Sequence, residues 1–205
     1  MNPVETITLA FTGASGMPYA MRLLESLLAA DKTVYLLHSQ AAQIVAQQEM
    51  GLTFPSSSRE FQQQLREQHR HLPGHVHVFG REEWFAPIAS GTSVADAMVV
   101  CPCTMGTLAA IAVGMSDSLI ERAADVSLKE QRKLILVPRE TPFSVIHLEN
   151  MLKLARLGAV ILPANPGFYH HPASVQDLVD FVVARILDHL NVPHQLMTRW
   201  GKSDA

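Results

Sequence analysis

The chain has 205 residues, of which 48% are hydrophobic and 17% are charged. This composition is too apolar for a disordered protein, and the small share of charged residues indicates that some surface is buried against other subunits. Sixteen Lys and Arg against nineteen Asp and Glu give a formal net charge of −3, which argues against a general nucleic-acid-binding protein.

The first fifty residues predict strand, turn, helix, strand and helix. A β-rich apolar run at 6–12 predicts a strand that ends in a glycine turn. From Pro18, which suits a first helical turn, to Leu28, apolar residues recur at helical spacing. A second strand at 33–37 and a helix at 40–48 complete the first half of a parallel nucleotide-binding sheet.

The middle of the chain begins with a polar segment. Residues 55–72 are expected to form an exposed excursion with one short helix. The alternating run at 75–79 predicts a strand, and 84–91 predicts a loop. The continuous apolar run at 96–102 is typical of a strand that is buried on both faces of a parallel sheet.

The second half alternates helices and strands. We expect helices at 104–113, 119–131, 143–157 and 174–190, and strands at 134–137 and 159–162. A tail begins at about residue 191. No repeat or linker divides the chain, so we expect one domain over residues 1–205. The pattern predicts a three-layer α/β/α, doubly wound parallel sheet of the Rossmann-like type.

Membrane and metal signals are missing from the sequence. Residues 1–5 have no signal-peptide character, and no apolar stretch reaches the ~18 residues of a membrane span. Cys101 and Cys103 are separated by one residue, which fits neither a disulfide framework nor a zinc site. The histidines form no metal-binding pattern. We therefore expect a soluble cytoplasmic protein without a metal.

Ligands of open parallel sheets bind outside the carboxyl ends of the strands. The segments expected there supply hydroxyl groups, free amides, two helix N-termini, one Arg and one Glu. These segments are Thr12–Gly16, His38–Ser39, Cys101–Thr107, Pro138–Pro142 and Pro163–Tyr169. Such a set of donors suits a planar ligand that carries a phosphate.

The glycine turn argues against NAD. Ser15 and Pro18 stand where a dinucleotide fingerprint needs glycines, and the second strand is followed by Ser39 rather than an acidic residue. The turn either cradles a phosphate or is merely a tight turn. Arg139 and Glu140, between two prolines, are either a solvated loop or a pair in which Arg139 binds a phosphate or flavin carbonyl and Glu140 acts as an acid.

Three other charged residues stand out in the sequence. By pattern alone, Glu49 is a surface carboxylate and Lys129 belongs to a solvated helix end. Arg185 interrupts an apolar helix, where an arginine either extends along the surface to water or reaches an anion.

Several long motifs in order resemble one known family. They are Thr12–Gly16, Cys101–Ile111, Leu119–Val126, Leu136–Pro142, His147–Leu152 and Pro166–His170. Together they resemble the UbiX-like flavin prenyltransferases over residues 7–190. The resemblance implies a metal-independent homo-oligomer, typically a dodecamer, that transfers a dimethylallyl group from dimethylallyl monophosphate to N5 and C6 of reduced FMN. The prenylated flavin then serves a UbiD-like decarboxylase, for example in ubiquinone synthesis.

The resemblance also implies roles for individual residues. The positions that match FMN contacts are Gly13, Ala14, Ser15, Ser39, Thr104, Met105, Gly106, Thr107 and Arg139. Substrate-binding positions are Trp84, Arg122, Lys129, Tyr169 and Arg185, and catalytic positions are Ser15, Glu49, Lys129 and Glu140. The charged residues of helix 119–131 are expected to reach the site of a neighbouring subunit.

Two alternative functions stay open at this point. A related FMN-dependent cysteine-type decarboxylase generally carries an Asn-containing motif after the fourth strand, but Pro102–Thr107 contains no Asn. A non-catalytic FMN carrier would leave Lys129, Glu140 and Arg185 without a role.

Overall fold

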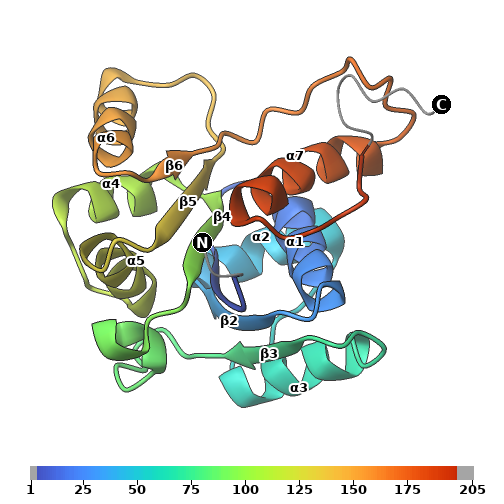
Figure 1. Ribbon diagram of the computed structural model, residues 1–205, viewed down its shortest axis with the longest axis horizontal. Helices are drawn as coiled ribbons and strands as arrows, with labels where there is room; N and C mark the ends of the chain where they lie inside the picture. The colour runs from blue at the N-terminus through green and yellow to red at the C-terminus, as the bar shows by residue number, and fades with distance from the viewer. Residues whose placement is uncertain (1–3, 198–205) are drawn as a thin grey trace.

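The computed structural model describes residues 4–197. Its strands are β1 (Thr6–Phe11), β2 (Thr33–His38), β3 (His75–Val78), β4 (Ala97–Cys103), β5 (Lys133–Pro138) and β6 (Val160–Ile161). They form one sheet in the order β3-β2-β1-β4-β5-β6, and every neighbouring pair is parallel (Figure 1). The predicted doubly wound sheet is confirmed, with the reversal of strand order between β1 and β4.

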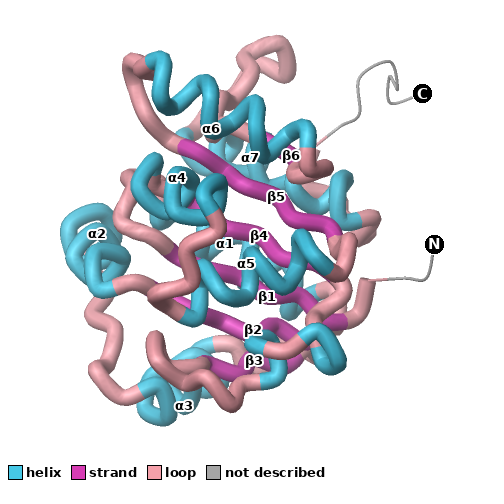
Figure 2. Tube along the Cα trace, turned by 90° about the vertical axis from the view of Figure 1, so that its left-hand side faces the viewer, coloured by secondary structure: helices cyan, strands magenta, loops and turns pink. Residues whose placement is uncertain are grey.

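The helices lie where the sequence predicts them, with ends shifted by a few residues. They are α1 (Met17–Ala29), α2 (Gln40–Met50), α3 (Ser58–Gln68), α4 (Met105–Val113), α5 (Leu119–Lys129), α6 (Val145–Arg156) and α7 (Val175–Leu190). The loop expected at 84–91 includes the short 3-10 turn η1 (Pro87–Ala89), and η2 (Gly91–Ser93) follows. The sheet therefore lies between two layers of helices, with α1 and α7 on one face and α5 on the other (Figures 1 and 2).

The two faces of the sheet have separate apolar cores. In β4, Val99 and Cys101 belong to the core shared with α1 and α7, whereas Val100 and Cys103 belong to the core shared with α4 and α5. Every residue of β4 is buried. A continuous apolar run is therefore needed in this strand, because alternate side chains enter different cores.

The segment 55–72 corrects a prediction. It is not a wholly exposed excursion, because α3 buries Phe61 and Leu65, each with 1% of its surface exposed. These two residues are four apart and share one helix face. Most of the other α3 residues are exposed or half-buried and polar, so the composition of the segment concealed its narrow apolar stripe.

The same helix covers the edge of the sheet at β3. Gln62 Oε1 accepts a hydrogen bond from the amide of Val78 at 2.9 Å, and Arg66 Nε donates to the carbonyl of Val76 at 3.3 Å. Two outward-facing groups of the edge strand thus have side-chain partners.

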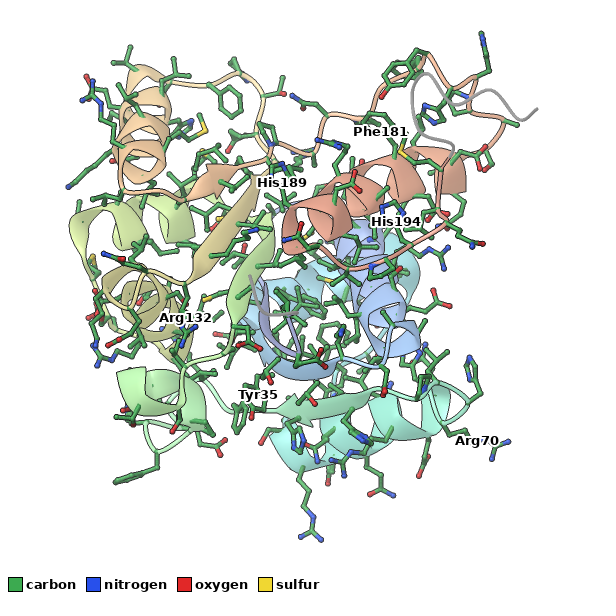
Figure 3. All side chains as sticks on the ribbon, viewed as in Figure 1. Tyr35, Arg70, Arg132, Phe181, His189 and His194 are labelled. Atoms are coloured by element: carbon green, nitrogen blue, oxygen red, sulfur yellow. The ribbon has the colours of Figure 1, made fainter. Side chains whose placement is uncertain are left out.

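The described part of the tail, residues 191–197, folds back on the domain. Val192 is buried, and the ring of His194, labelled in Figure 3, lies with Nε2 3.1 Å from a carboxylate oxygen of Asp188. The remainder of the predicted tail lies outside the described residues. Over residues 4–197, the helices are all too short or too polar to cross a membrane.

Candidate functional site

The turn after β1 is shaped by two glycines. A Cβ on Gly13 would collide with the side chain of Ala41 in α2, and Gly16 adopts φ 127°, which favours glycine. The turn thus packs closely under α2 and leads directly into α1. It places Gly13, Ala14 and Ser15 at the carboxyl end of β1, where the sequence leaves open a phosphate cradle or a simple tight turn.

Thr12 connects this turn to the next strand of the sheet. Its side chain is buried, and its hydroxyl donates to the carbonyl of Pro102 at 2.7 Å and accepts from the amide of Thr104 at 2.8 Å. Sequence reasoning assigned no role to Thr12, although a hydroxyl directly before the glycine turn was a usable signal. The ends of β1 and β4 are therefore held together at the point where the strand order reverses.

The start of α4 has its own cap. Thr104 Oγ1 accepts from the amide of Thr107 at 3.0 Å and lies 3.0 Å from the Thr107 hydroxyl. Gly106 is exposed in the first turn of this helix, whereas Met105 is buried. A helix N-terminus with an exposed glycine allows flat or anionic ligand atoms to approach the backbone.

α2 contributes residues from both of its ends. Ser39 extends the β1–β2 ladder by donating its amide to the carbonyl of Phe11 at 2.9 Å, and its side chain accepts from the amide of Ala42 at 3.1 Å. At the other end, the Glu49 carboxylate accepts from the amide of Gly16 at 3.0 Å and from that of Met17 at 2.7 Å.

Glu49 therefore corrects the interpretation drawn from pattern alone. Although its side chain is exposed, it is fixed at the N-terminus of α1, where Gly16 supplies no side-chain cap. A carboxylate there satisfies free amides and compensates the positive end of the helix dipole. The resemblance implies that Glu49 lies beside the reacting flavin, and this role stays a prediction.

Arg139 and Glu140 follow β5 at the same edge of the sheet. The amide of Arg139 donates to the carbonyl of Cys103 at 3.4 Å, so this segment stays in register with the end of β4. The Arg139 side chain is exposed, and a carboxylate oxygen of Glu140 accepts from the amide of Thr141 at 3.2 Å.

The structure thus brings most of the predicted flavin site to one edge. The strands concerned are neighbours in the order β2-β1-β4-β5. The residues that their carboxyl ends collect are Gly13, Ala14, Ser15, Ser39, Thr104, Met105, Gly106, Thr107, Arg139 and Glu140, with Glu49 beside them.

Within its own chain, Lys129 lies near the amino ends of the strands, opposite the carboxyl ends where the predicted flavin site gathers. It is the last residue of α5, and β5 begins four residues later at Lys133, whereas Glu140 follows the other end of β5. At ~3.3 Å per residue the strand separates the two groups by roughly 20 Å. The Lys129 ammonium forms an ion pair with the Glu130 carboxylate. Lys129 and Glu140 of the same chain therefore cannot contact the same phosphate.

A hollow of about 630 Å³ also opens at this amino edge. Its lining includes Asp96, Arg132 and Lys133, and Figure 3 labels Arg132. Ligands of parallel sheets bind at the other edge, so we assign this hollow no part in the site.

Arg122 lies in α5 and Trp84 lies in the loop before η1, so neither is at the glycine turn. The Arg122 guanidinium donates to the carbonyl of Ala89 at 3.1 Å and to the Asp125 carboxylate at 3.0 Å. Trp84 precedes η1, and 45% of its surface is exposed. Within one chain, neither Arg122 nor Trp84 lies with Arg139 at the carboxyl ends of the strands.

Tyr169 and Arg185 belong to the outer surface near α7. The ring of Tyr169 lies edge-on to Phe181, with centroids 5.7 Å apart, and Figure 3 shows Phe181 on the side of α7 that faces the loop after β6. Arg185 lies one helical turn beyond Phe181, is exposed, and pairs with Asp188 at 2.8 Å. Both expected phosphate contacts are therefore accessible from outside the chain.

Within residues 4–197, no three His, Cys, Asp or Glu side chains come together in an arrangement that would hold a metal ion.

Comparison with known proteins identifies the family. Residues 1–187 match the Flavoprotein family model. The chain is 56% identical over 202 residues to the flavin prenyltransferase UbiX of Pseudomonas aeruginosa, which covers 98% of this chain and 97% of the relative.

Two solved structures share the fold. AnUbiX (PadA1) in complex with FMN and dimethylallyl pyrophosphate superposes with TM-score 0.84 at 38% identity, over 98% of this chain and 100% of the other. A dodecameric FMN-dependent UbiX-like decarboxylase from Escherichia coli O157:H7 gives TM-score 0.81 at 41% identity, over 96% and 100% of the two chains. The chain therefore belongs to the Flavoprotein family and, within it, to the flavin prenyltransferases of the UbiX type.

Proposed function

We propose that this protein joins the dimethylallyl group of dimethylallyl monophosphate to N5 and C6 of reduced FMN, and that the prenylated flavin serves a UbiD-like decarboxylase. The observation that carries the proposal is the single edge at which Gly13–Ser15, Ser39, Thr104–Thr107 and Arg139 converge, in a chain 56% identical to a flavin prenyltransferase. Bound reduced FMN supplies the nucleophilic atoms.

The donor set at this edge fits a flavin phosphate. The turn before α1 and the starts of α2 and α4 offer backbone amides and the hydroxyls of Ser15, Ser39 and Thr107, and Arg139 adds a planar cation. In this proposal Thr104–Thr107 and Arg139 hold the flavin, and Ser15 and Glu49 lie beside its reacting part.

The donor substrate needs cations because its phosphate leaves with about two negative charges. Lys129, Arg122 and Arg185 stabilise that charge, and Tyr169 donates a hydrogen bond to it. Trp84 offers an aromatic face to the allylic cation. Glu140 then moves a proton from flavin C6 to the departing phosphate.

These groups meet only if neighbouring copies build the site together. Lys129 lies a full strand length from Glu140 in its own chain, so another copy must supply one of the two. α6 leaves Val145, Ile146 and Leu148 more than half exposed, which suits burial in a subunit interface. We propose a homo-oligomer, and a dodecamer by analogy with the Escherichia coli structure.

The test is an anaerobic reaction of the protein with reduced FMN and dimethylallyl monophosphate, followed by mass spectrometry of the flavin. A flavin heavier by one C5H8 unit supports the proposal. Unchanged flavin, with FMN still bound, overturns it in favour of an FMN carrier. Release of CO2 from a peptidyl cysteine or an aromatic acid by the FMN-loaded protein, without prenylated flavin, would indicate a decarboxylase instead.

The two alternative functions are not favoured. The relatives that match nearly the whole chain at 39–56% identity are named flavin prenyltransferases. A non-catalytic FMN carrier would also leave Lys129, Glu140 and Arg185 without a role.

A further inference from the structure

Tyr19 lies against the glycine turn of the proposed flavin site, and it has no part in the proposed reaction. It is in the first turn of α1, where its amide donates to the carbonyl of Gly16 at 3.1 Å. Its ring covers Gly16, because a Cβ on that glycine would lie 3.0 Å from the Tyr19 ring and 3.5 Å from the ring of Pro102. Tyr19 and the end of β4 therefore flank the same turn.

The charged and titratable groups around the Tyr19 hydroxyl come from three different elements. Burial raises the pKa of Tyr19, the buried Cys101 thiol and the Glu49 carboxylate raise it further, and the Arg139 guanidinium opposes them. Cys101 belongs to β4, Glu49 to α2, and Arg139 follows β5. Together with the contact between its ring and Gly16, these neighbours place Tyr19 beside the crevice at which the strand order reverses, the usual ligand position in this type of sheet.

The surroundings define what this hydroxyl can do. With a raised pKa it stays protonated at neutral pH, so it donates a hydrogen bond and carries no charge. Glu49 is already held by the amides of Gly16 and Met17. The ring is half-buried, which limits its freedom before a ligand arrives.

We propose that Tyr19 is an additional flavin-binding residue, whose neutral hydroxyl donates a hydrogen bond to an acceptor atom of the flavin bound at the glycine turn. The inference rests on the proposed function for the identity of the ligand. It adds a side-chain donor from α1 to a site that otherwise relies on that helix only for its N-terminus.

The experiment compares FMN binding by the full chain, Tyr19→Phe and Tyr35→Phe. The control residue Tyr35 lies in β2, with its ring edge-on to Phe79 at 5.5 Å, and is labelled in Figure 3. FMN is titrated by fluorescence quenching, the visible spectrum of the bound flavin is recorded, and the thermal midpoint of each apoprotein is measured.

We expect Tyr19→Phe to raise the Kd for FMN about 3- to 10-fold, the range of one hydrogen bond. It should also shift the visible band of the bound flavin while the apoprotein keeps its thermal midpoint. Tyr35→Phe should leave Kd and spectrum unchanged. A lower thermal midpoint with an unchanged spectrum would make Tyr19 merely structural and overturn the proposal, as would a Kd and spectrum equal to those of the unaltered chain.

The test separates this inference from the proposed function. If the unaltered chain binds FMN but forms no prenylated flavin, the proposed function fails, and the effect of Tyr19→Phe on binding still decides the role of Tyr19. If prenylated flavin forms equally well at limiting FMN with Tyr19→Phe, the role of Tyr19 fails and the proposed function stands.

Discussion

The hydroxyl of Thr12 and the amide of Thr104 are joined by a hydrogen bond of 2.8 Å. Through it, the last residue before the glycine turn fixes the residue that caps α4. The two turns that are proposed to hold the flavin therefore form one unit, and their relative position does not depend on the ligand.

The first prediction concerns this bond. Thr12→Val keeps the volume but leaves the partly buried amide of Thr104 without its acceptor, which should lower the free energy of unfolding by about 1–3 kcal/mol. FMN affinity should fall as well, because both turns lose their common anchor. Urea unfolding and FMN titration measure the two effects. Thr8→Val, a buried position within β1, is the control and should leave FMN affinity unchanged; equal effects of both variants would contradict the prediction.

The second prediction separates two roles of Glu49. Glu49→Ala removes the acceptor for the amides of Gly16 and Met17 and should destabilise the protein by about 1–2 kcal/mol, as loss of a helix cap does. Glu49→Gln keeps an acceptor, so its unfolding midpoint should change less. If the carboxylate also serves the reaction, Glu49→Gln should slow prenylation by about 100-fold. Chemical unfolding and single-turnover mass spectrometry give the two readouts. A fully active Glu49→Gln variant would restrict this residue to capping.

The third prediction tests whether the site is shared between copies. Lys129→Ala and Glu140→Gln should each be nearly inactive alone. Co-expressed with different tags and purified as mixed oligomers, they should regain about a quarter of the normal activity, since some sites then receive an intact residue from each copy.

A matched mixture provides the control for this experiment. Lys129→Ala mixed with Arg122→Ala should stay inactive, because both residues come from the same α5 helix. Recovery only in the first mixture supports a site built between chains. If the first mixture stays inactive, the two residues act within one chain or not at all.

The fourth prediction concerns acid stability. His38 lies edge-on to Phe54 and Phe61, with ring centroids 5.6 and 5.4 Å apart, and burial lowers its pKa below 6.5. As the pH falls, the unfolded chain therefore protonates His38 before the folded chain does. The contribution of neutral His38 to the free energy of unfolding is fully present above about pH 6.5. Below that pH the free energy of unfolding falls, by at most about 1.4 kcal/mol per pH unit for one group.

His38→Phe should reduce this acid loss, because the aromatic cluster is kept and the titrating group is gone. The free energy of unfolding is measured between pH 7.5 and pH 5, a range on the order of that in which histidines titrate. His71→Asn, at an exposed position, should not change the slope between these pH values. An unaltered slope in His38→Phe would show that the other histidines account for it.

The fifth prediction concerns the two thiols. Cys101 and Cys103 are both buried in β4, and burial raises the pKa of Cys103 to about 12 and that of Cys101 as well. Neither forms a thiolate near neutral pH, so both should be inert to a disulfide reagent in the folded protein and react in urea. A thiol that reacts at once in the native protein would contradict this placement.

The fold was readable from the sequence because its physical causes are local. The apolar run of β4 and the glycine turn after β1 each depend on neighbours in the chain. The segment 55–72 was misjudged because only Phe61 and Leu65 signal its buried side. Two apolar residues are too weak a signal of a buried helix face in a polar segment, because the sequence does not show which strand that helix covers.

The site was predictable in composition but less so in arrangement. Strand ends predict where Ser39, Thr104 and Arg139 gather, since parallel strands share one edge. Glu49 was ambiguous, because its position depends on how α2 returns toward α1. The two ends of β5 explain why Lys129 and Glu140 cannot meet in one chain, and this relation follows only from the order of helix and strand in space.

The two edge strands of the sheet, β3 and β6, limit how copies of the chain can associate. Gln62 and Arg66 occupy hydrogen-bonding groups of β3, and at the opposite margin β6 has only two residues. A foreign strand finds little free backbone at either margin, so copies cannot join by extending the sheet into a fibre. In the proposed oligomer, the contacts between copies are therefore expected from side chains on helices and loops, and such contacts can close into a shell of fixed size.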